Sequence, residues 1–352
     1  MNNLWKGRQE IGLSDAGKAF NDSIGFDHVM FEEDIEGSVA HAHMLGQVGI
    51  ISKDEAALIT SELEKIKEDI KSGAIVIDFD AEDIHTFVEM ELTKRIGDVG
   101  KKLHTARARN DQTATTAKLY LRKRVAEVQK AIAALVGTIN EVAEEHLDTI
   151  MPGFTHLQLA QPITLAHHLI GYNAMLMRDY ERIEDCLKRF NTSPLGAGAL
   201  AGTTFPIDRE MTSQALGFTK PAFNSMDAIS ARDHVIELAS ACAILMMHLS
   251  RMCEDIIIWN NQLFGFITLD DAHSTGSSMM PQKKNPDLAE LVRGKSGRVY
   301  GNLTSLLTIM KGLAMSYNKD MQEDKEPIFD SLQTVLHSLE VMKGMLGAAS
   351  FN

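Results

Sequence analysis

The sequence predicts a mainly α-helical protein with a small N-terminal helical domain and a larger domain of long helices. Three observations support this fold class. The chain has 352 residues, more than a single compact domain usually contains. Apolar residues beyond its first hundred or so positions recur at the period of an amphipathic helix. Alternation of the kind that marks a strand is limited to residues 74–79 (AIVIDF).

Residues 1–108 predict the smaller domain. Short periodic pieces alternate there with breaks at Gly46, Gly49, Gly73, Gly97 and Gly100. Glycine interrupts helices because it has a high conformational entropy to lose. We therefore expect several short helices joined by loops.

Residues 109–352 predict a bundle of long helices, of which the first should run from about residue 112 to 148. A second should cover about 163–190 and end at the Asn-Thr-Ser-Pro of residues 191–194. The first apolar face is formed by Leu121, Val125, Val128, Ile132, Leu135, Ile139 and Val142. The second is formed by Ile163, Leu169, Ile170, Met177, Tyr180, Ile183 and Leu187.

Three more helices complete this pattern, at about 235–259, 286–312 and 326–347. A helix of about thirty residues is about 45 Å long, which exceeds the diameter of a small globule. Such lengths predict a bundle that is completed by other subunits.

Composition excludes several classes of partner. The net charge is −13, and no tract rich in lysine and arginine stands apart from acidic residues, which argues against a nucleic-acid or anionic-membrane surface. Cys186, Cys242 and Cys253 form no Cys-x-x-Cys pair and are expected to be reduced thiols that fill the core. The N-terminus lacks the apolar segment of a signal peptide, so we expect a soluble, cytoplasmic protein.

Two motifs invite functional interpretations that the pattern does not support. The stretch PLGAGALAG (194–202) spaces its glycines as G-x-G-x-x-x-G with no strand before it, so a tight connection between helices is favoured over a dinucleotide site. His41 and His43 would point about 200° apart on a helix, and no third ligand follows at a usual spacing. We therefore expect no metal site.

Four polar segments interrupt the helical pattern, each near the end of a predicted helix, where unpaired N–H groups and the helix dipole favour an anion. Taken alone, each has an ordinary structural interpretation: Thr155 could cap a helix, and His156 could be a structural histidine. The segments are residues 103–112 (LHTARARNDQ), 151–162 (MPGFTHLQLAQP), 274–287 (STGSSMMPQKKNPD) and 316–327 (SYNKDMQEDKEP).

Residues 274–287 are the segment that an ordinary linker explains least well. Gly276 permits a sharp turn, while Pro281 and Pro286 restrict the chain. The same segment combines small hydroxyls with lysine and asparagine donors. This combination predicts a lid that closes on a carboxylate and keeps a serine near the reacting carbon.

The segment GSSMMPQKKNPD, followed by Glu290, resembles the signature GSSxMPxKxNPxxxE of the fumarase/aspartase superfamily. Further segments resemble the argininosuccinate lyase family, which includes the δ-crystallins. They are LWKGR, FNDSIGFD (20–27), EDIHTFVE (82–89), MPGFTHLQLAQP, LGAGALAGTTFPIDR (195–209), QKKNPD and YNKDMQEDKEP. The resemblance runs from residue 4 to about 330 in one consistent order.

The resemblance implies three helical domains, of which the middle one supplies five long helices to a twenty-helix core in a homotetramer. It implies active sites assembled from three subunits, no cofactor and no metal. It also implies reversible cleavage of argininosuccinate to arginine and fumarate. Because the chain stops at Asn352, we expect the family's small C-terminal helical domain to be absent.

Residue roles follow from the same resemblance. Ser277 corresponds to the base, with Ser278 as the alternative, while Lys283 and Asn285 correspond to the pair that binds the substrate carboxylate. Thr155 and His156 correspond to residues that orient or protonate the leaving nitrogen. The remaining expected substrate-binding residues are Ser23, His85, Arg109, Asn110, Tyr317, Gln322 and Lys325.

Ala108 departs from the family, which has a substrate-contacting serine at that position. This departure keeps a non-catalytic function open, and a second alternative lies within the same superfamily. The latter is a different fumarate-releasing lyase, acting on adenylosuccinate or aspartate; QKKN and YNKDMQEDKEP argue against it. The former is a non-catalytic, crystallin-like protein, against which the joint retention of the expected catalytic residues argues.

Overall fold

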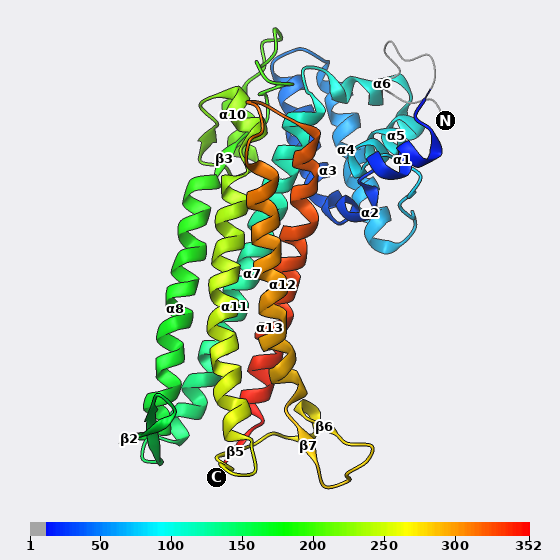
Figure 1. The fold of residues 1–352 in the computed structure, drawn as a ribbon. Helices are drawn as coiled ribbons and strands as arrows, with labels where there is room; N and C mark the ends of the chain where they lie inside the picture. Colours follow the sequence, from blue (N-terminus) through cyan, green and yellow to red (C-terminus); the bar gives the residue numbers. More distant parts are fainter. Residues whose placement is uncertain (1–11) are drawn as a thin grey trace. The chain divides into compact units, whose positions relative to one another are not determined.

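The computed structural model of the protein describes residues 12–352 and confirms the mainly α-helical fold (Figure 1). The described chain divides into two compact units, between which it passes several times. The first unit contains the described residues up to Tyr120, together with Asn191–Ala231 and Ala314–Lys325. The second contains Leu121–Phe190, Arg232–Leu313 and Glu326–Asn352. The domain boundaries 1–108 and 109–352 stay a prediction.

The first unit consists of short helices around one apolar core. Ile35, Leu45, Ile59, Leu63 and Ile84, from three of these helices, are fully buried in it. The elements are α1 (Asp15–Asn21), α2 (Ile24–Asp27), η1 (His28–Met30), α3 (Phe31–Gln47), α4 (Lys53–Ser72), α5 (Ile84–Ile96), α6 (Asp98–Lys101), η2 (Lys102–His104), β3 (Thr192–Ser193), α9 (Arg209–Ala215), β4 (Lys220–Pro221), α10 (Ser225–Ser230) and η4 (Lys319–Asp324).

Local sequence signals define α4 at both ends. At its start, the Ser52 hydroxyl accepts a hydrogen bond from the Glu55 amide (3.2 Å), and the Glu55 carboxylate accepts one from the Ser52 amide (3.0 Å). At its end, Gly73 adopts a left-handed conformation with φ of 76°. Both ends are thus satisfied without help from the rest of the chain.

The second unit consists of long helices that run beside one another (Figure 1). Helix α7 (Arg109–Glu145) begins in the first unit and continues into the second. The other elements are β1 (Ile150–Thr155), β2 (Gln158–Thr164), α8 (Leu165–Phe190), α11 (Asp233–Trp259), β5 (Ile267–Thr268), η3 (Asp271–His273), β6 (Thr275–Gly276), β7 (Lys284–Asn285), α12 (Asp287–Met310), α13 (Lys325–Gly347) and β8 (Ser350–Phe351).

The five predicted long helices are present within a few residues of their expected bounds, as α7, α8, α11, α12 and α13. The apolar face expected on α7 is buried from Leu121 to Ile139. The apolar face predicted on α8 is only partly buried. Leu169 and Ile183 are buried, whereas Ile170 and Met177 are 43% and 46% exposed in the single chain.

Residues 74–79, the only plausible short extended piece in the sequence, form no strand in the structure. Ile75 and Ile77 pack against the core of the first unit, but Val76 and Phe79 are exposed, and none of the strands in the described part of the chain pairs with them. The longest strands are instead β1 and β2, an antiparallel hairpin that pairs Ile150 with Thr164. Two prolines and a glycine hide its alternation in the sequence, and its second strand is largely exposed.

The expectations about the cysteines and about the tight connection at residues 194–202 are confirmed. All three cysteines are buried, and burial raises the pKa of the Cys186 thiol to about 11 and of the Cys242 thiol to about 12. Residues 194–202 form a tight connection, in which a Cβ at Gly198 would lie 2.5 Å from the Gly202 carbonyl oxygen.

Helix α11 is long and apolar enough to cross a membrane, but 61% of its most apolar 18-residue stretch is buried, as in the core helix of a soluble protein.

His41 and His43 face different surroundings on α3. His41 is buried and its Nε2 lies 2.9 Å from the Thr105 carbonyl oxygen, while its Nδ1 is buried without a hydrogen-bond partner. His43 is exposed. Burial, reinforced by the Arg107 guanidinium, lowers the pKa of His41 to about 3. The ring is therefore neutral in the folded chain at neutral pH.

This neutral histidine predicts a loss of stability on acidification. Between its folded pKa of about 3 and its ordinary value of 6.5, only the unfolded chain takes up the proton, so the free energy of unfolding falls as the pH drops below about 6.5. We expect His41→Gln to lower this slope by up to ~1.4 kcal/mol per pH unit. Urea unfolding at several pH values measures it. His43→Gln is the control, and equal slopes for His41→Gln and the wild type would contradict the prediction.

Candidate active site

The predicted site residues divide between the two compact units. The first unit contains Ser23, His85, Arg109, Asn110, Tyr317, Gln322 and Lys325. The second contains Thr155, His156, Ser277, Ser278, Lys283 and Asn285.

Ser23 is buried at the start of α2 and is fixed by its neighbours. Its hydroxyl donates to Asp27 Oδ2 at 2.6 Å, and Asp27 Oδ1 accepts from the Ile84 amide at 3.0 Å. The Ser23 amide in turn donates to the Glu82 carbonyl oxygen at 2.8 Å. These bonds hold Ser23 against the N-terminus of α5, the helix that also carries His85.

His85 is an interior residue of the first unit. Its Nδ1 lies 2.6 Å from Asp34 Oδ1 on α3, and both side chains are 1% exposed. Its Nε2 lies 3.2 Å from the Thr113 hydroxyl on α7. Burial alone would lower the pKa of His85, but the Asp34 carboxylate outweighs this effect and raises that pKa. Burial alone would raise the pKa of Asp34, but His85 outweighs this effect and lowers that pKa. The charge pair therefore joins α3 to α5, and the hydrogen bond of His85 to Thr113 extends the connection to α7.

Arg109, in the first turn of α7, is held by residues from the start of α5. Its Nε lies 3.1 Å from Asp83 Oδ2, its Nη1 lies 3.2 Å from Glu89 Oε1, and its Nη2 donates to the Thr86 hydroxyl at 3.1 Å. Burial opposes ionisation of Glu89, but bonds from His104 and the nearby guanidinium groups keep its pKa well below the usual range. Arg109 is thus oriented by two carboxylates, and its side chain remains 22% exposed.

Asp111 fixes the glycine-rich connection against the start of α7. Its Oδ1 accepts from the Ala108 amide, and its Oδ2 accepts from the amides of Gly196 and Gly198, each at 2.9 Å. The neighbouring Asn110 side chain donates to the Ala199 carbonyl oxygen at 2.9 Å. The expected substrate residues of segment 103–112 therefore belong to a rigid backbone framework.

Residues 317–325 lie close to the chain that precedes Ser23. Gln322 donates to the Asn21 carbonyl oxygen at 3.0 Å, two residues before Ser23. Lys325 donates to Asp324 at 2.7 Å with both side chains 6% exposed, and Tyr317 packs against a small buried apolar cluster. The first unit thus places Ser23 near Gln322, although some three hundred residues separate them in the sequence.

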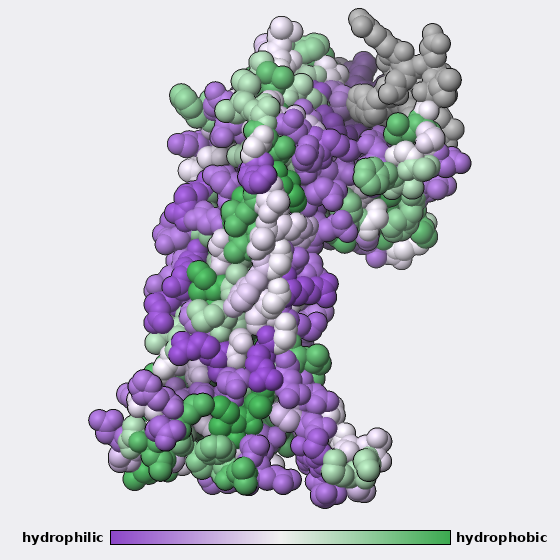
Figure 2. All heavy atoms as spheres, viewed as in Figure 1, coloured by the Kyte–Doolittle hydropathy of each residue, from purple (hydrophilic) through white to green (hydrophobic). Residues whose placement is uncertain are grey.

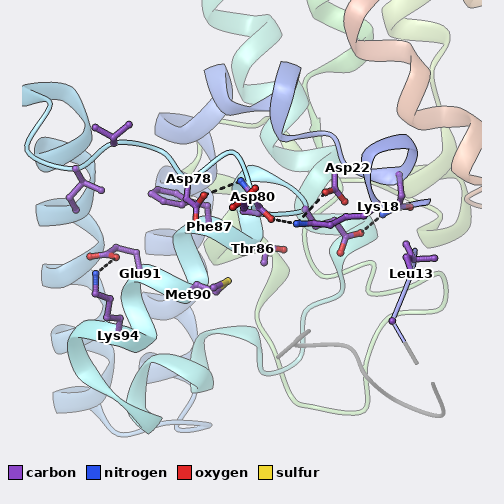
Figure 3. Close-up of a pocket in the computed structure, with 16 residues that line it drawn as sticks. Leu13, Lys18, Asp22, Asp78, Asp80, Thr86, Phe87, Met90, Glu91 and Lys94 are labelled. Carbon is purple, nitrogen blue, oxygen red and sulfur yellow. Dashed lines mark hydrogen bonds and ion pairs between the residues drawn. The ribbon is translucent and has the colours of Figure 1, made fainter. Parts of the chain in front are cut away.

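A cavity of about 650 Å³ opens beside this group (Figure 3). Asn21 and Thr86 line it, next to Ser23 and Arg109 respectively. Figure 3 shows Lys18 reaching across it, with Nζ 2.6 Å from the Asp80 carbonyl oxygen. Most of the charged groups on its wall are acidic: Asp22, Asp78, Asp80, Glu82 and Glu91. The cavity therefore suits a cationic group better than a carboxylate.

In the second unit, Thr155 and His156 lie at the tip of the β1–β2 hairpin. His156 and Leu157 form the turn with φ of 55° and 56°, the left-handed conformation that two-residue hairpin turns require. Such angles are strained for residues other than glycine. The hairpin therefore holds the His156 ring in an exposed position at the end of a fixed turn.

Behind the hairpin, a cavity of about 860 Å³ contains polar residues that sequence reasoning missed. His168 Nε2 lies 2.7 Å from Asp255 Oδ2, and the Tyr172 hydroxyl donates to the same oxygen at 2.5 Å. His168 and Asp255 line this cavity together with Thr155 and His156. Burial, and then the Asp255 charge, raise the pKa of Tyr172 well above its usual range. The adjacent histidines in AHHL were the only signal in the sequence.

The Ser277 segment is a loop closed by the short antiparallel pair β6–β7. Thr275 pairs with Asn285 and Gly276 with Lys284. The Ser277 hydroxyl accepts hydrogen bonds from the amides of Met279 (3.3 Å) and Met280 (3.1 Å). Two N–H groups aimed at one oxygen favour a partial negative charge there.

Lys283, Lys284 and Asn285 lie in the returning half of this loop. Lys283 is exposed and Asn285 is half-buried in β7. The bonds of Ser277 stay within its own loop, and the hairpin and the β6–β7 loop lie apart in the second unit (Figure 1). A single chain thus presents Ser277 and His156 separately. Among the described residues, no cluster of three or more histidine, cysteine or acidic side chains could hold a metal ion.

Comparison with known proteins places this chain among lyases. The model of a lyase family matches residues 7–301. The argininosuccinate lyase of Heliobacterium mobile is 58% identical over 97% of this chain and 75% of its own length. That of Ruminiclostridium cellulolyticum is 57% identical over 98% of this chain and 75% of its own length.

Solved structures agree with this placement. An EDDS lyase in complex with formate is 30% identical, with a TM-score of 0.83 over 93% of this chain and 64% of its own. A class II fumarase from Schistosoma mansoni has a TM-score of 0.84 at 16% identity, over 97% of this chain and 81% of its own, and so shares the fold.

The substitution Gly153→Ala tests whether close packing of β1 against β2 holds the tip of the hairpin in place. A Cβ there would lie 2.5 Å from the Gln161 carbonyl oxygen, so Gly153→Ala must spread the two strands. We expect the amides of β1 and β2 to exchange with deuterium at least about tenfold faster, as ~1.4 kcal/mol of strain would produce. Gly171→Ala on α8, where a Cβ meets no atom within 4 Å, is the control. Unchanged exchange in Gly153→Ala would show that the hairpin does not depend on this contact.

Proposed function

This chain belongs to the argininosuccinate lyase family, and on that premise we propose that it cleaves argininosuccinate reversibly to arginine and fumarate. The observation that carries the proposal is the Ser277 loop, where two amide N–H groups point at the serine oxygen within a few residues of Lys283 and Asn285. A serine hydroxyl is a weak base in water, and such donors stabilise the alkoxide that it must become.

The proposed reaction is a β-elimination. Ser277 removes a proton from the carbon beside a succinate carboxylate, and Lys283 and Asn285 bind that carboxylate while its charge grows in the aci-carboxylate intermediate. One well-placed donor of this kind lowers the activation free energy by roughly 3 to 4 kcal/mol. The electron pair then forms the carbon–carbon double bond of fumarate as the carbon–nitrogen bond breaks.

The leaving guanidino nitrogen needs a proton. We assign its delivery, directly or through a water molecule, to His156, with Thr155 orienting the group. The exposed position of both residues at the hairpin tip supports this assignment. No step requires a cofactor or a metal ion.

The first unit supplies the binding surface for the rest of the substrate. Arg109 and Asn110 are held rigidly at the start of α7, and Ser23 lies near Gln322. Arginine carries positive charge, which agrees with the acidic cavity beside them (Figure 3). The other proposed binding residues are His85, Tyr317 and Lys325.

We further propose a homotetramer whose active sites combine residues from three subunits. Ser277 and His156 lie in separate places within one chain, so one substrate can meet both only if another copy contributes. Figure 2 shows apolar side chains on the outer face of the bundle helices. The exposed apolar residues of α8 and α12 include Ile170, Met177, Leu291 and Leu307, each more than 40% exposed.

Turnover assays test the catalytic assignment. We expect the wild type to release fumarate, followed by its ultraviolet absorbance, from argininosuccinate and not from adenylosuccinate or aspartate. Ser277→Ala should lower kcat at least a hundredfold, since it removes the base while it leaves the fold intact. Ser72→Ala, an exposed serine at the end of α4, is the control. Comparable kcat in Ser277→Ala would show that another residue is the base.

Sedimentation velocity tests the assembly. We expect four chains of 38.9 kDa in one species at micromolar concentration, because burial of the exposed apolar residues of α8 and α12 favours association. A monomer that turns over argininosuccinate would contradict the shared active site.

A further inference from the structure

His273 occupies an unusual position just before the Ser277 loop. It is the last residue of η3, and its Nδ1 lies 2.6 Å from Asp270 Oδ1. The other edge of its ring lies against Gly344 on α13: a Cβ at Gly344 would be 2.6 Å from His273 Nε2. Because real Cβ atoms do not approach so closely, only glycine at position 344 accommodates the ring.

The chain before His273 is fixed to the C-terminal segment. In β5 and β8, Ile267 pairs with Phe351, and the Asn352 amide donates to the Phe266 carbonyl oxygen at 3.0 Å. The Ser274 hydroxyl also donates to the Asp270 carbonyl oxygen at 2.7 Å. Residues 266–274 therefore have several contacts that hold them in place.

The chain after His273 is held far less firmly. Gly276 has no atom within 4 Å of an added Cβ, and most residues from 275 to 284 are exposed. Across the base of the loop, Lys284 pairs with the exposed Asp271, and the Thr275 hydroxyl donates to Asp287 at 2.5 Å. Surface pairs of this kind contribute little stability. His273 thus marks the boundary between the fixed and the weakly held parts of the chain.

We infer that His273 is a positioning residue for Ser277: its ring, held by Asp270 and seated against Gly344, anchors the base of the catalytic loop to α13. This inference rests on the proposed function of Ser277. The hydrogen bond from His273 lowers the pKa of Asp270, in agreement with a persistent pair. Loss of the anchor would let the loop shift, and a displacement of about 1 Å at a reacting group can reduce a rate a hundredfold.

Gly344→Ala is the direct test, because its methyl group must displace the His273 ring. We expect kcat for argininosuccinate to fall between about ten- and a hundredfold with an unchanged thermal midpoint. Trypsin should also cleave faster after Lys283 or Lys284 in the native protein, since a released loop enters a protease more readily. Gly301→Ala on α12, where a Cβ meets no atom within 4 Å, should leave both measurements unchanged.

His273→Ala provides a second test that introduces no clash. It should reproduce the loss of kcat and the faster cleavage, and the double variant with Gly344→Ala should lose no more than either single variant, because both remove one contact. Wild-type kcat and cleavage in His273→Ala would overturn the inference, as would a loss of kcat that only follows a lower thermal midpoint. If the wild type released no fumarate, the proposed function would fail, whereas the trypsin rates would still decide whether His273 anchors the loop.

Discussion

The buried charge pairs between α3, α5 and α7 are the interactions on which the first unit depends. Asp34 and Glu89 are carboxylates inside the unit, and a buried charge is tolerated only when it is paired and hydrogen-bonded. Asp34 meets this condition through His85 and Gln112, and Glu89 through the guanidinium groups at the start of α7. The same bonds to these carboxylates set the directions of His85 and Arg109. The side chains that stabilise the buried carboxylates are therefore the same ones that we propose bind substrate.

The long helices could be predicted from the sequence because their apolar period is local and repeats many times. α11 and α13, for example, were expected at 235–259 and 326–347 and span Asp233–Trp259 and Lys325–Gly347. The hairpin of β1 and β2 could not be predicted, because its pairing depends on two prolines, a bulge and a turn in which His156 adopts a left-handed conformation. Residues 74–79 have a strand-like pattern but no partner strand.

Part of the candidate site could likewise be predicted from the sequence, and part of it could not. Composition alone singled out residues 274–287, and the loop there is closed by β6 and β7 with Ser277 facing two amides. The partners of the site residues were not visible, since Asp34 and Asp111 bond to groups far away in the sequence. His168 and Asp255, which share a cavity with His156, were missed for the same reason. Sequence patterns identify reactive groups, while the groups that orient them are set by long-range packing.

We propose that Ser277, Lys283 and His156 act on one dicarboxylate substrate together with residues of the first unit. The most direct measurement is a crystal structure of the Ser277→Ala protein, which should bind argininosuccinate without cleaving it. We expect a succinate carboxylate at Lys283 and Asn285, the bridging nitrogen near His156, and Tyr317 beside the arginine half. A ligand bound in either unit with Ser277 and His156 both remote from it would contradict this proposal.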